Sequence, residues 1–144
     1  MSDITDDLLK EILREACGDD DGEPLALAVC HLDGTVVSAG DDAVDFCLQS
    51  ATKPFVYALA LDQKGVDEVA ERIGVEPSGE AFNEISLEAG TGRAANALIN
   101  AGALVAHSLV GEPDDDEGTR FEKIRRLFST LVGRDVEVDE EVAD

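Results

Sequence analysis

The sequence has few basic residues. It contains 11 Lys and Arg against 33 Asp and Glu, so its formal net charge is −22. Proteins that bind nucleic acid or anionic membrane surfaces place positive charge against phosphate groups. The summed field of this chain repels such surfaces at ordinary salt. We therefore expect neither nucleic-acid binding nor membrane binding.

Cysteine and long apolar runs are also scarce. Cys17, Cys30 and Cys47 are odd in number, with neither C-x-x-C spacing nor a paired-His pattern, which argues against a disulfide framework and against a zinc site. No apolar run approaches the roughly 18 residues that a membrane span needs, and no basic-apolar signal segment opens the chain. We expect a soluble, cytoplasmic protein without metal or cofactor.

What the sequence does contain is enough apolar surface for one core. Its 144 residues fit a single ordinary domain, and 44% of them are hydrophobic. The acids are spread between apolar stripes, which is typical of a salt-adapted surface rather than of a disordered acidic tail. At molar salt the screening length falls to about 3 Å, which relieves repulsion between the acids. A halophilic cytosol is the favoured habitat, and an acidic protein from a moderate organism is the alternative.

The first third of the chain predicts a helix and the first strands of a sheet. Residues 4–16 carry an apolar stripe at helical spacing, with acids on the other face. Strands are predicted at 25–32 and 35–40 on either side of Asp33-Gly34, a strong hairpin signal. Residues 43–49 are rich in strand formers and predict a third strand.

The rest of the chain is predicted to be mainly helical. Periodicity and stop signals predict largely buried helices at 51–65 and 95–110. They also predict a short helix at 66–74 and an amphipathic helix at 119–133. A turn-rich loop at 75–84, a solvated linker at 111–118 and an acidic tail at 134–144 complete the organisation. The expected division is therefore 1–50, helix and first strands, and 51–144, mainly helical.

Ser50 and Lys53 are spaced for nucleophilic chemistry. A serine hydroxyl needs a base within hydrogen-bond reach, and residues three apart share one face of a helix. The amino terminus of a helix adds unpaired N–H groups and a partial positive charge, which favour an oxyanion. Pro54 belongs in or just after a first helical turn, which places Ser50 at the helix start, although it disfavours helical backbone at Lys53. The alternative is an ordinary helix cap at Ser50 and a surface lysine at position 53.

Three stretches of the chain together resemble one family, the serine-dependent glutaminases. They occur in the order FCLQSATKPFVYALAL, GVEPSGEAFNEISLE and NALINAGALV. The resemblance runs from about residue 26 to about residue 133. It implies an α+β fold of the β-lactamase/DD-peptidase-like kind, with an antiparallel sheet packed against helices. It also implies hydrolysis of L-glutamine to L-glutamate and ammonia through a serine acyl-enzyme, without metal or cofactor.

The same resemblance implies roles for particular residues. Ser50 matches the family's nucleophile and Lys53 its general base. Gln49 matches a residue that lines the substrate pocket, and Asn100 matches a substrate-binding asparagine, whose amide can both donate to a carboxylate and accept from an ammonium. The alternative for Asn100 is a helix cap beside tightly packed small residues. Ser78 and Asn83 fall in a structural turn of the family and are expected to be turn residues.

The chain also departs from the family pattern. The family's substrate-contacting tyrosine upstream of the first strand has no counterpart, since the only tyrosine is Tyr57, and Ala97 replaces a common proline. Family domains continue beyond the length of this chain and there supply a glutamate, an asparagine, two tyrosines and a backbone oxyanion donor. We therefore expect a single partial domain over 1–144, apparently truncated at its C-terminus. Its isolated activity should fall at least about 1,000-fold, because a lost oxyanion donor costs roughly 100- to 1,000-fold and lost positioning groups add to that.

Three hypotheses about function follow from the sequence. The first is a glutaminase or its nucleophile-bearing part, completed by a second copy of the chain or by a complementary C-terminal fragment that covers the exposed sheet edge. The second is a non-catalytic glutaminase-like interaction module or gene remnant. The third is a β-lactamase-type enzyme, which the absence of K-T-G and S-D-N elements disfavours.

Overall fold

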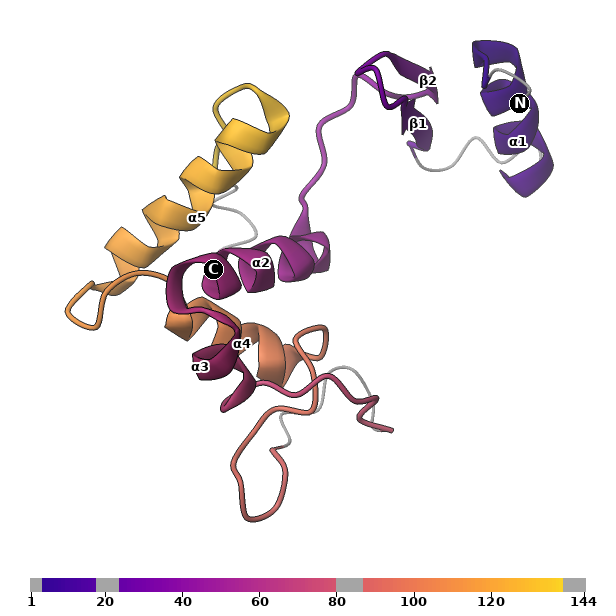
Figure 1. Cartoon of the computed structure of the whole chain (residues 1–144). Helices are drawn as coiled ribbons and strands as arrows, with labels where there is room; N and C mark the ends of the chain where they lie inside the picture. Colours follow the sequence, from indigo (N-terminus) through magenta and orange to yellow (C-terminus); the bar gives the residue numbers. More distant parts are fainter. Residues whose placement is uncertain (1–3, 18–23, 80–86, 139–144) are drawn as a thin grey trace. The chain divides into compact units, whose positions relative to one another are not determined.

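The structure, a computed structural model of the whole chain, describes residues 4–17, 24–79 and 87–138 (Figure 1). Its contacts divide the chain into two compact units, Met1–Cys47 and Leu48–Asp144. In the described ranges no helix is both long and apolar enough to cross a membrane. Those ranges also hold no group of three or more His, Cys, Asp or Glu side chains that could bind a metal ion. Each unit is described below by itself.

The first unit is a helix and a hairpin. Helix α1 spans Asp6–Cys17 and packs against β2, and its Leu9 is 2% exposed. Strand β1 (Ala26–Cys30) pairs antiparallel with β2 (Val36–Gly40). The Gly34 amide donates to the carbonyl of His31 at 2.9 Å and closes the turn. The predicted helix at 4–16 and the predicted hairpin are confirmed.

The predicted third strand at 43–49 is wrong. The chain turns directly after β2, where the Val44 amide donates to the Asp41 carbonyl at 3.1 Å, and it then runs without a strand partner. Among the described residues the sheet has only the strands β1 and β2. A strand needs a hydrogen-bonded neighbour, so residues with a high strand propensity do not form a strand by themselves. The side chain of Phe46 is accordingly 78% exposed.

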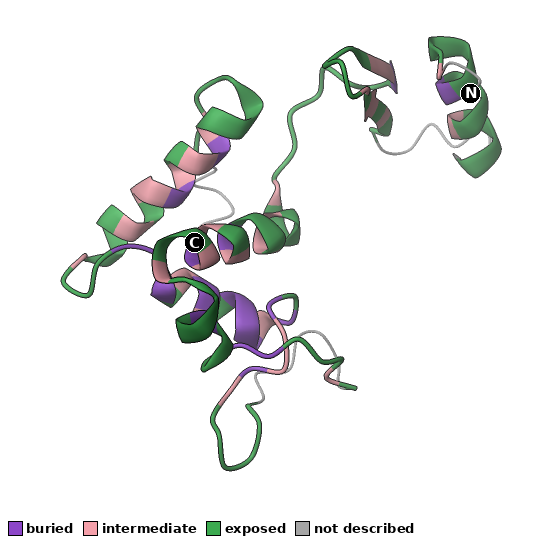
Figure 2. Cartoon of the chain, viewed as in Figure 1, coloured by how far each residue is buried: buried purple, intermediate pink, exposed green. Residues whose placement is uncertain are grey.

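The second unit is helical, as predicted. A 3-10 turn, η1 (Gln49–Thr52), leads into α2 (Lys53–Lys64), and the unit continues with α3 (Val66–Ala70), α4 (Asn100–Leu109) and α5 (Glu117–Val132). Its core gathers small, branched and aromatic side chains of these helices, including Val56, Ala60, Val69, Ala106, Ile124 and Phe128. Figure 2 shows α4 as the most continuously buried helix. Its small side chains let α2 pack closely against it.

Helix α4 begins later than the predicted 95–110. Residues 94–99 form an extended and turning segment, and the segment's Ala94 makes an isolated parallel bridge with Ile73. Two glycines approach the backbone of this segment. A Cβ on Gly74 would stand 2.5 Å from the Ala95 carbonyl oxygen, and one on Gly102 only 1.8 Å from that of Asn96. The segment is therefore held between the residue stretch after α3 and the first turn of α4.

The predicted solvated linker between α4 and α5 is tied down by one arginine. The guanidinium of Arg120 donates to the backbone carbonyls of Ser108, Val110, Glu112 and Asp115 at 2.8, 2.7, 2.9 and 3.1 Å. A planar guanidinium with five donors suits such a set of acceptors. The loop thus has a fixed path although most of its side chains are exposed.

Candidate functional site

Ser50 and Lys53 lie at the junction of η1 and α2. Ser50 is the second residue of the 3-10 turn, and the Lys53 amide donates to the Ser50 carbonyl. Lys53 has helical backbone, φ −52° and ψ −51°, although Pro54 follows it. Proline disfavours helical backbone at the residue before it, and Lys53 adopts that backbone nonetheless. The start of α2, with its partial positive charge, lies three residues after Ser50.

Ser50 does not cap a helix. The residues in capping positions are Leu48 for η1 and Thr52 for α2, and neither makes a side-chain capping bond. Ser50 is exposed, and its hydroxyl makes no hydrogen bond with any residue that the structure describes. The hydroxyl is thus accessible to a reactant.

Gln49, directly before Ser50, has an unusual backbone. Its φ is 41°, and it is the only non-glycine residue of the described ranges with positive φ. Left-handed backbone costs a side-chain-bearing residue about 1 to 2 kcal/mol. The Thr52 hydroxyl donates to the Gln49 carbonyl at 2.7 Å and helps to hold this turn. Such outliers cluster at functional sites, where the turn sets the direction of a neighbouring side chain.

The amine of Lys53 reaches the second unit's other buried helix. Its Nζ donates to Asn100 Oδ1 at 2.6 Å and to the Leu98 carbonyl at 3.1 Å. The side chain is partly buried, so Lys53 is not the surface lysine of the alternative interpretation. It makes no salt bridge within the described ranges, and both its acceptors are uncharged groups.

Asn100 is the first residue of α4, and its side chain does not cap the helix. The capping position belongs to Ile99, which makes no side-chain capping bond. The Oδ1 of Asn100 instead accepts from Lys53, and within the described residues its Nδ2 group donates to no protein acceptor. This leaves two N–H donors for a ligand, beside a lysine and one helix away from Ser50.

This arrangement suits Lys53 as a base. A neutral lysine amine has two N–H bonds and one lone pair. Leu98 O and Asn100 Oδ1 can take both N–H groups, so the lone pair is what remains to accept the proton of a nearby hydroxyl. In apo structures catalytic hydrogen bonds are often incomplete and tighten when substrate binds. Ser50 is the hydroxyl that shares the helix start with Lys53.

Sequence reasoning missed two contributors to this site, the Leu98 carbonyl and Asn96. The Oδ1 of Asn96 accepts from the amides of Leu98 and Ile99 at 3.0 and 3.3 Å. A carbonyl acceptor has no sequence signal. Asn96 had one, because asparagine binds its own backbone two residues on and so favours a turn before a helix. The prediction of a continuous helix from residue 95 obscured that signal.

Other residues named from the sequence lie away from this cluster or outside the described ranges. Tyr57 lies in α2, partly buried against the core. Ser78 lies in a loop without regular structure, as predicted for that turn-rich segment, and Asn83 is outside the described residues.

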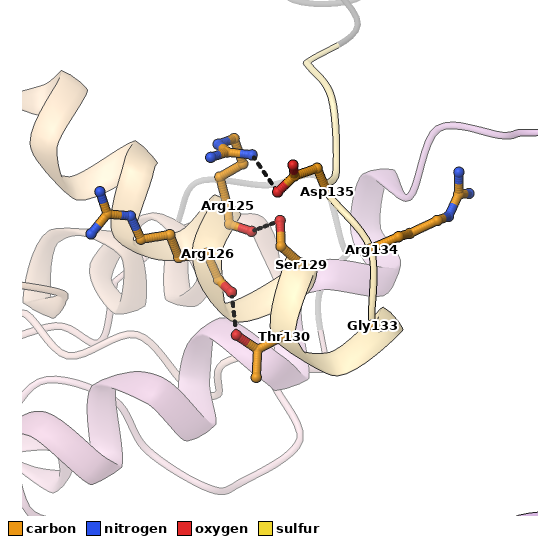
Figure 3. Close-up of a pocket in the computed structure, with 7 residues that line it drawn as sticks. All are labelled: Arg125, Arg126, Ser129, Thr130, Gly133, Arg134 and Asp135. Carbon is orange, nitrogen blue, oxygen red and sulfur yellow. Dashed lines mark hydrogen bonds and ion pairs between the residues drawn. The ribbon is translucent and has the colours of Figure 1, made fainter.

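A shallow depression of about 450 Å³ lies at the end of α5, and it does not include Ser50, Lys53 or Asn100 (Figure 3). It is lined by Arg125, Arg126, Ser129, Thr130, Gly133, Arg134 and Asp135. Arg125 and Arg126 both donate to Glu122, which lowers the pKa of that carboxyl from 4.5 to about 2. The hydroxyls of Ser129 and Thr130 donate to carbonyls of their own helix. The polar groups of this depression are thus mostly bonded to other groups of α5. The cluster of Lys53, Asn100 and Ser50 is therefore the stronger candidate site, although none of the three lines this depression.

Comparison with known proteins agrees on one family. A family model described as Glutaminase matches residues 16–144. A glutaminase of Corynebacterium efficiens is 47% identical over 126 residues, which cover 88% of this chain and 30% of that protein. A glutaminase of Corynebacterium glutamicum is 48% identical over 124 residues, or 86% of this chain and 30% of that protein. The chain thus spans about a third of the length of these curated relatives.

Solved structures agree on the fold. A crystal structure of Mglu in its glutamate form superposes with a TM-score of 0.84 at 37% identity, covering 98% of this chain and 36% of that one. Mglu in its L-glutamate binding form in 4.3 M NaCl gives 0.82 at 37% identity, covering 94% and 34%. A probable glutaminase of Bacillus subtilis gives 0.74 at 34% identity, covering 83% and 38%. The fold class is therefore α+β, and it is the β-lactamase-like fold that the motifs predicted.

Proposed function

The chain belongs to the glutaminase family, and from this we propose that the protein hydrolyses L-glutamine to L-glutamate and ammonia through an acyl-enzyme on Ser50. The observation that carries the proposal is the pair of hydrogen bonds from Lys53 Nζ to Asn100 Oδ1 and Leu98 O, at 2.6 and 3.1 Å. Both acceptors of the lysine amine are uncharged, and the exposed Ser50 lies one helical turn before the lysine. Relatives that share this stretch are named glutaminases.

In the proposed reaction Ser50 Oγ attacks the side-chain amide carbon of glutamine while Lys53 accepts the hydroxyl proton. Lys53 then returns that proton to the departing nitrogen, so that ammonia leaves and an acyl ester remains on Ser50. A water molecule, deprotonated by Lys53, attacks the ester and releases glutamate. The oxyanion donors and further substrate contacts are assigned to the part of the family domain that this chain does not span.

Gln49 and Asn100 are proposed substrate contacts. The left-handed turn at Gln49 directs a side chain from the position next to the nucleophile. The Nδ2 of Asn100 is a donor suited to a carboxylate such as that of glutamine. We also propose that residues 1–144 form part of one domain, completed by the remaining family sequence or by a second copy.

The habitat is proposed as a halophilic cytoplasm. The net charge of −22 is tolerated most easily where molar salt screens it. The related Mglu has been crystallised in 4.3 M NaCl. We propose no cofactor, so a metal chelator should leave activity unchanged.

The proposal is tested by ammonia release from L-glutamine in molar NaCl. The chain is assayed alone and fused to the part of the Corynebacterium efficiens glutaminase that follows the matched region. We expect the fusion to be active and Ser50→Ala and Lys53→Ala each to lower kcat at least about 1,000-fold, since nucleophile and base act as one unit.

Matched controls are available on the same helices. Ser108→Ala removes an exposed hydroxyl that donates to the Val105 carbonyl, and Lys64→Ala removes the lysine in the last turn of α2. Both should retain activity within about twofold, as surface substitutions usually do. A Ser50→Ala fusion with parental activity would overturn the acyl-enzyme proposal. An inactive but folded fusion would favour a non-catalytic module.

A further inference from the structure

We propose that Asn96 is a positioning residue for Lys53. Its side chain closes the turn that presents both acceptors of the lysine amine, the Leu98 carbonyl and Asn100 Oδ1. The inference rests on the proposed function for the catalytic meaning of Lys53, while the geometry that it assigns to Asn96 can be measured without any activity. Asn96 opens the stretch NALINAGALV, but the sequence analysis assigned it no role.

The side chain of Asn96 is bonded at both ends. Its Oδ1 accepts from the amides of Leu98 and Ile99, and its Nδ2 donates to the Glu76 carbonyl at 3.0 Å. The first two bonds close the turn immediately before α4. The third bond joins that turn to the stretch that follows α3, twenty positions earlier in the chain. The side chain therefore closes the turn and adds one bond between the turn and that stretch.

The backbone of the same residue is fixed independently of its side chain. The first turn of α4 approaches so closely that a Cβ on Gly102 would stand 1.8 Å from the Asn96 carbonyl oxygen and 2.9 Å from the Ala97 Cα. On the other side of the segment, the Gly74 amide donates to the Ala94 carbonyl at 2.7 Å. This packing keeps the segment in place, so Asn96 has the narrower task of fixing the peptide groups at 98 and 99.

The positions of the two Lys53 acceptors depend on the peptide groups that Asn96 fixes. Leu98 is 61% exposed, so no apolar packing of its side chain holds its carbonyl in place. The Leu98 amide, bonded to Asn96 Oδ1, is what restrains the residue, and Asn100 follows after one more residue. Without Asn96 Oδ1, water satisfies the free amides, the turn relaxes, and the lysine amine loses its fixed direction.

The lysine amine can be observed directly by NMR. The chain has four lysines, so a sample labelled with ¹⁵N at lysine Nζ gives few signals, and Lys53→Met assigns the one from Lys53. We expect Asn96→Ala to shift the Lys53 signal and to speed exchange of its protons with water at least about 10-fold. Asn96→Asp keeps both acceptor bonds to the turn and should leave the signal near its parental position.

Lys123 serves as the internal control. Its Nζ is paired with Asp115 in the α4–α5 loop, so its signal should be the same in all variants and reports that the unit is folded. A parental Lys53 signal in folded Asn96→Ala would overturn the proposal. If Asn96→Ala is unfolded, Asn96→Asp decides, because loss of its Lys53 signal with Lys123 unchanged contradicts the acceptor role.

Activity of the fused protein separates this inference from the proposed function. We expect Asn96→Ala to lower kcat about 10- to 100-fold, with KM changed less than about twofold, and Asn96→Asp to recover most of that loss. Full kcat in Asn96→Ala, with Ser50→Ala and Lys53→Ala inactive, refutes the positioning role alone. Full activity in Ser50→Ala refutes the proposed function and leaves the NMR result standing.

Discussion

Lys53 is surrounded by neutral acceptors in a chain that is rich in acids. The sequence has 33 acidic residues, yet the amine donates to an amide oxygen and a backbone carbonyl. A carboxylate in either place would favour the protonated lysine, which cannot accept a proton. The choice of acceptors at this single side chain is therefore what distinguishes a candidate base from the ion pairs found elsewhere on the chain.

Gln49 provides a prediction at the residue scale. Gln49→Gly removes the steric cost of a left-handed backbone, which outweighs the extra freedom of glycine in the unfolded chain. We expect the free energy of unfolding to rise by up to about 1 kcal/mol, measured by denaturation in molar salt. The activity of the fused protein should nevertheless fall, because the proposed substrate contact is lost.

Gln49→Ala is the matched control for that prediction. It keeps the steric cost of the left-handed backbone and loses the same amide group, so activity should fall without a gain in stability. Parental activity in both variants would show that the turn at residue 49 serves only the backbone.

Glu122 provides a prediction about pH. Its hydrogen bonds from Arg125 and Arg126 lower the pKa of the carboxyl from 4.5 to about 2 in the folded protein. The unfolded chain therefore binds a proton first, and the stabilisation is complete above pH 4.5 and is lost as pH falls through about 2. The free energy of unfolding should fall more steeply between pH 5 and pH 2 in the parent than in Glu122→Gln, as followed by urea denaturation.

Glu117→Gln is the control for that pH dependence. Glu117 lies in the first turn of the same helix and makes no ion pair in the described ranges. Its variant should follow the parental slope. Parallel curves for the parent and Glu122→Gln would show that the ion pairs do not persist in solution.

At the scale of elements, the start of α4 is the decisive feature of the second unit. The helix begins at Asn100 because residues 94–99 are bound to the stretch after α3 and to the first turn of α4. That boundary places Asn100 where its side chain meets Lys53 of α2. A helix continuing from residue 95 would have turned the Leu98 carbonyl into an intrahelical acceptor.

Gly102 tests this packing. Helix propensity alone predicts that Gly102→Ala stabilises α4 by about 1 kcal/mol. The new Cβ, however, would stand 1.8 Å from the Asn96 carbonyl oxygen, which is backbone and cannot rotate away. We expect a net loss of about 1 to 3 kcal/mol in the free energy of unfolding, together with weaker binding of Lys53 by its acceptors.

Gly118→Ala, in the first turn of α5, provides the comparison. The nearest atom to a Cβ there is Asp116 Oδ1 at 3.8 Å, an ordinary contact. This variant should gain up to about 1 kcal/mol from propensity. Equal effects of the two alanines would contradict the close approach at Gly102.

At the scale of the whole molecule, charge dominates. A net charge of −22 on 144 residues destabilises compact states through self-repulsion unless salt screens it. We expect the chain to fold poorly below about 0.5 M NaCl and to gain helicity toward molar salt, where the screening length is about 3 Å. Circular dichroism across a salt series measures the change.

Sucrose separates screening from general stabilisation of compact states. It is excluded from protein surfaces but does not screen charge. At matched osmolality it should restore less helicity than NaCl. Full helicity at low salt without any additive would remove the argument for a halophilic origin.

The sequence by itself determined the features that depend on neighbouring residues. The turn at Asp33-Gly34, the stripe of α1, the periodicity of α5 and the placement of Ser50 and Lys53 at a helix start are local, and the structure confirms them. Short-range backbone preferences suffice for such features. The motifs also sufficed to identify the family.

Only the tertiary structure decided which groups meet. Lys53 and Asn100 are 47 positions apart, and their contact exists because small side chains let α2 and α4 pack closely. Tertiary contacts also explain the two differences from the predicted elements. A strand requires a hydrogen-bonded partner, and residues 43–49 have none among the described residues. Helix α4 starts late because the residues before Asn100 bind other segments instead of continuing the helix. Long-range packing sets these outcomes, and the sequence pattern at residues 43–49 does not show whether a partner strand is present. At residues 95–99 only the turn preference of Asn96 indicated the late helix start.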